Sequence, residues 1–528
     1  MTKWKELEQD YEKGRMTRRE FITRAAALGI ALAAVPGLTP PNAFAASGPK
    51  RGGRLRMGVS GASTTDSMAV SGLPGIMMQV LVYGQIGNSL LEIKPDGDVG
   101  PELAESWEAS ADAKTWFVKL RKGVTFHNGQ PLTADDVIHS INIHRGEKSK
   151  SAAKAIAAPI KSVTKDGEWT LRFELETPNA DFPFILTDYH LVIVPKGHDG
   201  SEGVFTGPYK IKTFEPGVRI LTTRNENYFR NDVAWFDEVE TIGINDANAR
   251  LNALKTGQVD LVDRVELKML RFLERTPGIQ IIKKKGYKHF TFPMFTDQAP
   301  FSDNNVRLAL KHAVDREQLV KTIFRGYAAV GNDHPISPVN RYHASELPQR
   351  AYDPDKAKFY LKKAGLSSLD VPFHVADTAF MGAVDSGLLF RESAAKAGIN
   401  LKVVREPEDG YWSNVWLKKS FCACFWAGRA VEDMMFSTAY ATGSAWNDSH
   451  WAHPRFNELL VSARGELDET KRRSMYVEMQ QLVKDEGGVI VPAFGMNIAA
   501  ASKKIGYGKV AANWELDGMR AAQRWWFA

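Results

Sequence analysis

The sequence of 528 residues contains only two cysteines, Cys422 and Cys424. Two cysteines cannot form the set of disulfides that stabilises many small secreted domains. On the strand predicted around them the two side chains share one face, where a bridge between them would be strained. We expect two buried thiols, because free cysteine packs as a small apolar residue. A pair of metal ligands is the alternative hypothesis.

The sequence also lacks the short motifs of several enzyme classes. No Gly-x-Ser-x-Gly, His-Glu-x-x-His, Gly-x-Gly-x-x-Gly or phosphate-binding Gly-Lys-Ser/Thr motif occurs after residue 45. Hydrolase, metalloprotease and nucleotide-binding functions therefore have no local support. His450 and His453 could together bind a metal, but such a site normally needs a third ligand. We predict no resident cofactor or metal, and nickel remains an alternative cargo.

Neither sign of charge dominates the sequence. It carries 68 basic and 62 acidic residues, which gives a net charge of +6 at pH 7. The basic run Lys283–Lys285 is too short to form a nucleic-acid-binding patch, and we predict no nucleic-acid partner. Apolar residues make up 44% of the chain, which is enough for a large core. Because the chain is long for one compact domain, we expect two or three lobes.

The N-terminal 45 residues have the features of an export signal. Thr17–Ile22 reads TRREFI, an apolar run follows at Ala25–Val35, and Ala43–Ala45 offers a small-residue cleavage site. This segment resembles a twin-arginine signal peptide, which implies passage through the twin-arginine translocase. The apolar run is roughly half the ~20 residues that span a bilayer, so we expect a soluble periplasmic protein after cleavage. Met16 is an alternative start that the sequence does not exclude.

Residues 101–145 are the most informative block of the chain. Trp116, Val118 and Leu120 alternate with the other residues of 116–121, which predicts a half-buried strand. Asn128-Gly129 predicts a tight turn, and Thr133 with Asp136 predicts a capped helix. The block resembles the signature of extracytoplasmic solute-binding proteins of family 5, which serve dipeptide, oligopeptide and nickel ABC importers. Similar blocks continue along most of the chain after residue 45.

The resemblance implies an α/β fold with two lobes, of the type II periplasmic binding protein class with an extra subdomain. Two crossovers between the lobes would act as hinges that close on a ligand. The expected divisions are lobe I at 46–288 plus 499–528, its inserted subdomain at about 84–200, lobe II at 296–490, and hinges at about 289–295 and 491–498.

Candidate ligand-binding residues concentrate in 411–451, where large aromatic residues are unusually dense. In peptide-binding relatives, a Trp-x-Gly segment is followed by an Asp that pairs with the peptide's ammonium group. Here the matching segment is Trp426–Gly428, and Arg429 replaces the acid. The predicted ligand-binding residues are Phe295, Tyr411, Trp412, Trp426, Arg429, Asp433, Trp446 and Asn447.

Two hypotheses for Arg429 remain open. Its guanidinium could bind a carboxylate of the cargo, because arginine forms bidentate pairs with carboxylates. Alternatively it could pair internally with Glu432 or Asp433, and Asp433 would then supply the site for an ammonium group. Many of the neighbouring tryptophans are expected in the core, because tryptophan is highly buried on average.

The function implied is a monomeric periplasmic protein that binds a small organic solute and delivers it to the permease subunits of an ABC importer. A peptide or peptide-like cargo is expected first, and opines, amino-acid derivatives and other carboxylates are alternatives. An exported hydrolase or metal-dependent enzyme is the competing hypothesis, and it lacks an identifiable set of catalytic residues.

Overall fold

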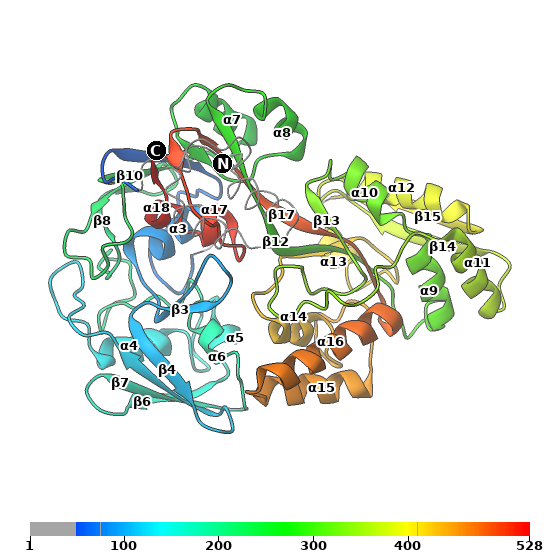
Figure 1. The fold of residues 1–528 in the computed structure, drawn as a ribbon, viewed down its shortest axis with the longest axis horizontal. Helices are drawn as coiled ribbons and strands as arrows, with labels where there is room; N and C mark the ends of the chain where they lie inside the picture. Colours follow the sequence, from blue (N-terminus) through cyan, green and yellow to red (C-terminus); the bar gives the residue numbers. More distant parts are fainter. Residues whose placement is uncertain (1–48, 74, 409) are drawn as a thin grey trace, which may run out of the picture. The chain divides into compact units, whose positions relative to one another are not determined.

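The computed structural model describes residues 49–73, 75–408 and 410–528. The predicted signal peptide, residues 1–45, lies outside these ranges. A sheet of nine strands runs through the described protein in the order β16-β12-β17-β11-β1-β10-β9-β8, and β13 pairs with β17 (Figure 1). We call the part built on β1 and β8–β11 lobe I, and the part built on β13–β16 lobe II.

Lobe I is a mixed sheet with helices on both faces. β1 is parallel to β10 and β11, and β9 and β8 continue the sheet in antiparallel fashion. Alternate residues of β1 pack against α3, α17 and α18, whereas α7 and α8 cover the other face. The strands are β1 (Arg54–Val59), β8 (Tyr209–Glu215), β9 (Arg219–Arg224), β10 (Glu238–Gly243) and β11 (Leu261–Val262). The helices are α3 (Ile76–Leu81), the π-helix η2 (Val82–Ile86), α7 (Ala247–Lys255), α8 (Leu267–Leu273), α17 (Glu515–Gly518) and α18 (Ala521–Arg524).

The inserted subdomain has its own sheet and core. The strand predicted at 116–121 is β5 (Thr115–Leu120), one residue earlier than expected, in which Val118 and Leu120 are fully buried. Thr133 and Asp136 form the predicted capping box of α4 (Ala134–Ile143). These predictions are confirmed because strand alternation and helix capping are local properties. The other elements are β2 (Leu91–Ile93), β3 (Val99–Pro101), β4 (Ala104–Ala109), β6 (Ile160–Lys165), β7 (Thr170–Leu175), α5 (Lys154–Ala157) and α6 (Phe182–Ile185).

Lobe II contains two helical layers around the end of the large sheet. Its strands are β13 (Ala328–Val330), β14 (Leu369–Val375), β15 (Ile399–Arg405) and β16 (Cys424–Trp426), of which β14 and β15 are parallel. One apolar cluster packs α9, α11 and α12 against β14 and β15, and a second joins α14, α15 and α16. The helices are α9 (Asn304–Ala313), α10 (Arg316–Thr322), α11 (Pro354–Lys363), α12 (Ala383–Ala395), α13 (Tyr411–Asn414), α14 (Glu432–Ala439), α15 (Pro454–Gly465) and α16 (Glu469–Glu486).

Two long antiparallel strands, β12 (Ile279–Pro293) and β17 (Val489–Ser502), run through both lobes. Their register shifts between Lys285 and His289, where residues 286–288 of β12 lie opposite Gly495 of β17. A bulge of this kind bends and twists a strand locally. The remaining strands, β18 (Ile505–Gly506) and β19 (Trp526–Phe527), pair near the C-terminus.

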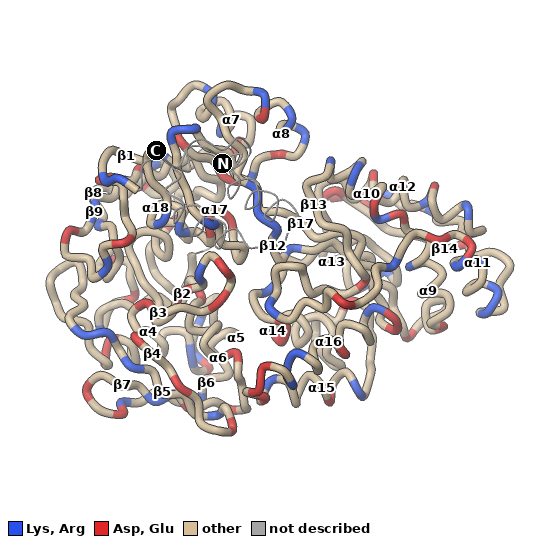
Figure 2. The backbone as a smooth tube through the Cα atoms, in the orientation of Figure 1, with Lys and Arg blue, Asp and Glu red and all other residues tan. Residues whose placement is uncertain are grey.

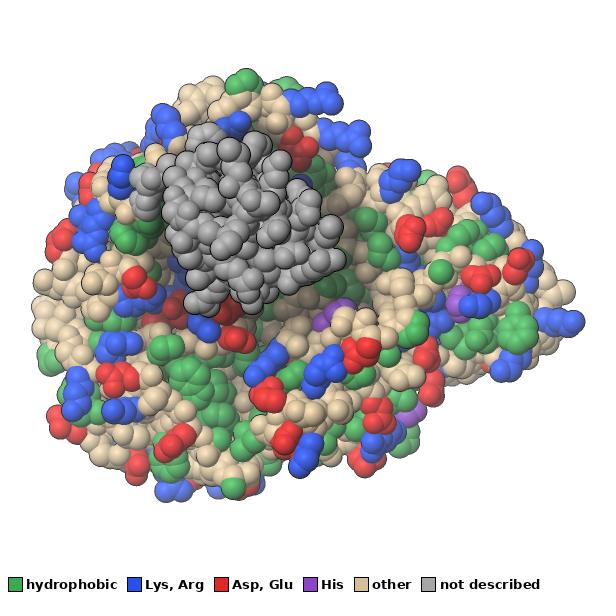
Figure 3. Space-filling model, in the orientation of Figure 1, with side chains coloured by type: hydrophobic (Ala, Val, Ile, Leu, Met, Phe, Trp, Pro, Cys, Tyr) green, Lys and Arg blue, Asp and Glu red, His purple; other side chains and the backbone are tan. Residues whose placement is uncertain are grey.

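Charged residues of both signs are distributed along the chain and mixed over the face shown in space-filling form (Figures 2 and 3). Within the described ranges, no helix combines the length and the apolar character needed to cross a membrane.

Candidate functional site

A cavity of about 570 Å³ lies between the two lobes and against both long strands. Lobe I contributes a wall from the segment after β11, and lobe II contributes the segment after β14 together with Phe425 of β16. The lining residues are Arg264, Val265, Glu266, Leu267, Lys288, Phe290, Phe324, Tyr327, Asp377, Thr378, Ala379, Phe380, Met381, Phe425, Gly495, Met496, Ile498 and Glu515.

The sheet topology explains why a cavity forms here. One edge of β17 pairs with β11 at residues 500–501 and with β13 at residues 493–495. Between these pairings, Met496 and Ile498 line the cavity. The segments after β11 and β14 begin at the carboxyl ends of parallel strands, which is where α/β proteins commonly bind ligands.

The cavity has an aromatic side. Phe290 of β12 stacks on Phe324 with ring centroids 4.6 Å apart, and it contacts Phe380 at the same centroid distance. Phe425 contacts Trp412 edge-to-face at 5.8 Å. Such rings favour apolar or planar groups of a ligand, because they bury large areas without unpaired polar atoms.

Charged groups also line the cavity, and Lys288 lies next to Phe290: a Cβ atom added to Gly495 would come within 3.3 to 3.5 Å of both side chains. Arg264 of lobe I pairs with Glu515 at 2.9 Å, and Glu266 pairs with Lys268 at 2.8 Å. Lys288 has no carboxylate within salt-bridge distance among the residues that the structure describes, and its carbon chain lies close to Gly495. An ammonium group beside aromatic residues, without a counter-ion in the described part of the chain, suits a ligand carboxylate.

Four tryptophans form a second aromatic group around β16. Trp416 contacts Trp412, Trp426 and Trp446 at centroid distances of 5.9 to 6.1 Å. Trp446 and Trp412 are 49% and 40% exposed, whereas Trp426 is buried. β16 is the terminal strand of the nine-stranded sheet. No other strand of the described structure pairs with its second edge, although His374 of β14 bonds Phe421 and Ala423 just before it. Edge strands of this kind can accept an extended ligand backbone.

Asp448 is a buried acid beneath this tryptophan group that sequence reasoning missed. It is 4% exposed, and Trp416 Nε1 donates a hydrogen bond of 3.1 Å to its carboxylate. Burial raises the pKa of Asp448 to about 6, although hydrogen bonds from Trp416, Cys424 and Trp426 oppose the rise. No local motif marks this residue, because its neighbours come from separate segments of the chain.

We expect the tryptophan fluorescence of the protein to titrate with Asp448. Asp448 has a pKa of about 6 in the folded protein and near 4 in the unfolded chain, so protonation of this acid stabilises the folded state. This stabilisation is complete below about pH 4 and is lost as the pH rises through about 6. A fluorescence change with a midpoint near pH 6 should disappear in Asp448→Asn. Asp370→Asn, a substitution at an exposed position of β14, is the control. A midpoint retained in Asp448→Asn would contradict the assignment.

Arg429 lies at the end of the segment that follows β16. Its Nη1 donates to the Gly428 carbonyl at 2.8 Å, and no described carboxylate forms a salt bridge with it. Burial lowers the pKa of Arg429, and the Asp188 carboxylate opposes that shift. The internal pairing considered for Arg429 is absent, because Glu432 accepts from the Tyr342 amide at 2.7 Å.

Asp433 is also engaged elsewhere, since Arg464 Nε donates to it at 3.0 Å. Three other predicted ligand-binding residues are buried in the protein interior. Tyr411 donates to the Ala423 carbonyl, Asn447 donates to the Trp451 carbonyl, and Phe295 stacks on His450 with centroids 3.9 Å apart.

None of the eight predicted ligand-binding residues is among the residues that line the cavity. Trp412 is connected to it through Phe425. Trp426 and Trp446 belong to the tryptophan group around β16, and Arg429 follows Trp426 in the sequence. The role of these residues in binding stays a prediction.

The predicted buried thiols are confirmed. Cys422 and Cys424 are free and 1% exposed, and burial raises their pKa. His450 is paired with Asp297 at 3.0 Å, and His453 accepts from the Phe456 amide at the start of α15. Within the described ranges, no group of three His, Cys, Asp or Glu residues could hold a metal ion.

Comparison with known proteins identifies the family. Residues 98–448, more than half of the chain, match the model of bacterial extracellular solute-binding proteins, family 5 Middle. The chain belongs to this family. It is therefore a solute-binding protein of the ABC-importer type and not an enzyme.

Individual relatives of this family 5 protein bind different solutes. It is 26% identical to heme-binding protein A of Haemophilus influenzae, over 80% of this chain and 84% of that protein. It is 24% identical to the dipeptide-binding protein of Escherichia coli, over 79% and 85%. HbpA2 from Haemophilus parasuis has the same fold, with a TM-score of 0.80, 21% identity and coverage of 88% and 99%. The predicted periplasmic binding protein fold is confirmed.

Proposed function

We propose that this family 5 protein binds a peptide or peptide-like molecule that carries an apolar group and a carboxylate. The observation that carries the proposal is the cavity between the lobes, which is lined by aromatic residues and, next to Phe290, by Lys288. The apolar group would lie against Phe290, Phe324 and Phe380, and the carboxylate would pair with Lys288. A charge-assisted hydrogen bond at Lys288 would orient the cargo in the cavity.

We propose that binding is coupled to a hinge motion of β12 and β17. The break in register at residues 286–288 supports a hinge just before the first predicted crossover, 289–295, and Gly495 lies within the second, 491–498. Lys288 and Gly495 both line the cavity, so a ligand there would contact the hinge directly. The predicted division into lobe I at 46–288 plus 499–528 and lobe II at 296–490 is part of this proposal.

The route of the protein to its site of action is also proposed. The twin-arginine resemblance of residues 1–45 and the extracellular character of the family support export to the periplasm. There the mature protein would act as a monomer and transfer its cargo to ABC permease subunits in the inner membrane. Neither a nucleic acid nor a resident metal is part of this function.

The cargo should be recovered by purifying the protein from periplasm, denaturing it and analysing the released molecules by mass spectrometry. Calorimetry with the recovered compound should then show at least a tenfold loss of affinity for Lys288→Met, because removing one partner of a desolvated ion pair costs about 2–5 kcal/mol. Arg429→Met tests the second predicted carboxylate-binding position. Lys402→Met, on the exposed surface of β15, is the control. A recovered cargo without a carboxylate, or wild-type affinity in Lys288→Met, would contradict the proposal.

A further inference from the structure

The inserted subdomain and lobe II touch through a buried ion pair that is separate from the cavity. Asp181 precedes α6 of the subdomain, Arg472 lies on α16 of lobe II, and the two side chains form a salt bridge. Asp181 is 4% exposed and Arg472 is 2% exposed. Charged side chains are rarely buried so completely unless they are paired. Each therefore depends on the other for its burial.

Backbone contacts reinforce the same junction. The Ala180 amide donates to the Arg464 carbonyl at 2.7 Å, which joins the subdomain to the end of α15. A Cβ atom added to Gly465 would lie 3.0 Å from Cβ of Pro178. The two surfaces are therefore in close van der Waals contact around the ion pair.

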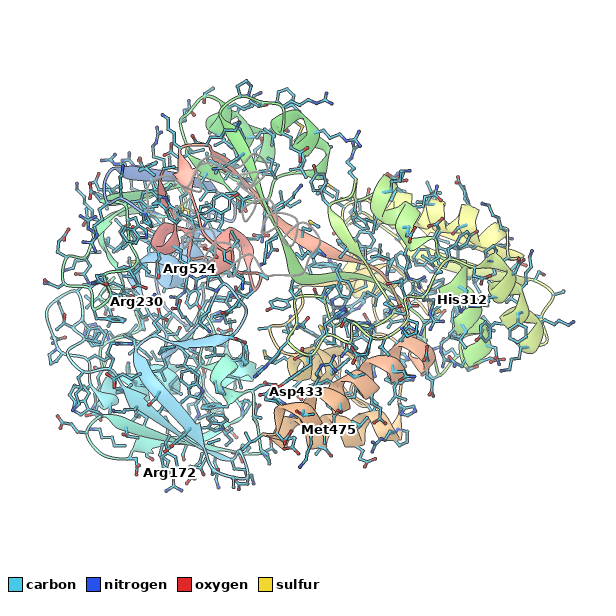
Figure 4. The ribbon with its side chains drawn as sticks, viewed as in Figure 1. Arg172, Arg230, His312, Asp433, Met475 and Arg524 are labelled. Carbon is cyan, nitrogen blue, oxygen red and sulfur yellow. The ribbon has the colours of Figure 1, made fainter. Side chains whose placement is uncertain are left out.

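Lobe II holds Arg472 in place independently of the subdomain. Arg472 Nε donates to the Ala463 carbonyl at 3.0 Å, and the guanidinium lies 5.5 and 5.6 Å from the ring centres of Tyr342 and Tyr476. Arg464, next to the junction, is held by Asp433. Figure 4 labels Asp433 on α14 and Met475 on α16, the two helices that flank this region. A preorganised arginine loses little freedom when Asp181 arrives.

We propose that the Asp181–Arg472 pair, together with the Ala180–Arg464 hydrogen bond, is a latch that holds the inserted subdomain against lobe II in the closed protein. This inference rests on the proposed hinge motion of the lobes. Contacts at the hinge strands can persist while the lobes move, because those strands belong to both lobes. The latch joins the inserted subdomain to lobe II, which only lobe closure brings together. It must therefore break when the lobes open, and it shifts the equilibrium toward the closed state.

The latch can be tested on ligand-free protein by electron–electron distance measurements. Spin labels at Glu168→Cys in the subdomain and Lys396→Cys in lobe II occupy exposed positions, and the native cysteines are buried. Asp181→Asn should lower the ratio of closed to open molecules at least tenfold. Glu346→Gln is the matched control, because it removes the partner of the adjacent Arg473 at 2.8 Å within lobe II alone. The control should keep the wild-type distances.

A double variant and the hydrogen exchange of one amide test the latch in two further ways. The double variant Asp181→Leu/Arg472→Met should restore closure, since an apolar pair can replace a buried ion pair. In the unmodified protein, hydrogen exchange of the Ala180 amide should be slowed at least a hundredfold, which requires no variant to fold. A folded Asp181→Asn protein with wild-type distances, or an unprotected Ala180 amide, would overturn the latch. The cargo proposal is tested separately by Lys288→Met. If this variant changes cargo affinity but not the distances between the spin labels, the result bears on the cargo and not on the latch.

Discussion

Replacing Asp333 by alanine should lower the free energy of unfolding by about 3–5 kcal/mol, the usual cost of leaving a buried ion pair without one partner. Asp333 is fully buried in lobe II. It accepts hydrogen bonds of 2.6 and 2.7 Å from Arg316, pairs with Arg350 Nε at 2.9 Å, and accepts from the Val491 amide of β17 at 3.1 Å. The variant would leave two buried guanidinium groups without this carboxylate.

The pH dependence of this contribution has a defined sign. Burial alone would raise the pKa of Asp333, but Arg316, Arg350 and Lys311 hold it below its ordinary value. A carboxyl group with a lowered folded-state pKa stabilises the protein fully above its unfolded pKa, and the contribution is lost as the pH falls through the folded value. The difference between wild type and variant should therefore be complete at neutral pH and shrink only in acid.

Chemical denaturation followed by circular dichroism measures this effect. Asp355→Ala is the matched control, because Asp355 forms an ion pair with Lys358 at 3.4 Å while its side chain is 91% exposed. Exposed pairs of this kind contribute about 0–1 kcal/mol. A loss in Asp333→Ala no larger than that of the control would show that the network around Asp333 does not anchor lobe II to β17.

Local sequence signals predicted the elements of this fold well. Thr133 and Asp136 form the predicted capping box at the start of α4. The alternation along residues 116–121 predicted β5 to within one residue. Each of these signals depends on residues a few positions apart, so the sequence contains all of the relevant information.

The cavity could not be derived in the same way. Arg264, Lys288 and Phe380 lie in separate segments and meet only because β12 and β17 pass through both lobes. The density of aromatic residues in 411–451 does indicate the tryptophan group around β16, but it does not separate exposed Trp446 from buried Tyr411. That difference depends on tertiary packing, which overrides composition.

Gly428 shows how the segment carrying Arg429 is held against the hinge. Its φ is +78°, in the left-handed region, and a Cβ atom there would lie 2.2 Å from the carbonyl oxygen of Tyr287, within the bulge of β12. Glycine therefore allows the chain after β16 to cross the bulge in direct contact. A side chain would force this segment, with Trp426 and Arg429, away from β12.

Gly428→Ala should therefore lower the free energy of unfolding by about 2–5 kcal/mol. An alanine in the left-handed region costs about 1–2 kcal/mol, and its clash with Tyr287 adds an overpacking cost of about 1–3 kcal/mol. Gly443→Ala is a close control, because Gly443 has a φ of +80° with no atom within 4 Å of its added Cβ. It should show the strain alone. The difference between the free energies of unfolding of the two variants gives the cost of the clash with Tyr287. Cargo affinity should fall only in Gly428→Ala, where the segment carrying Arg429 is displaced. Equal losses of stability would mean that the contact with Tyr287 relaxes without cost and does not fix this segment on the hinge.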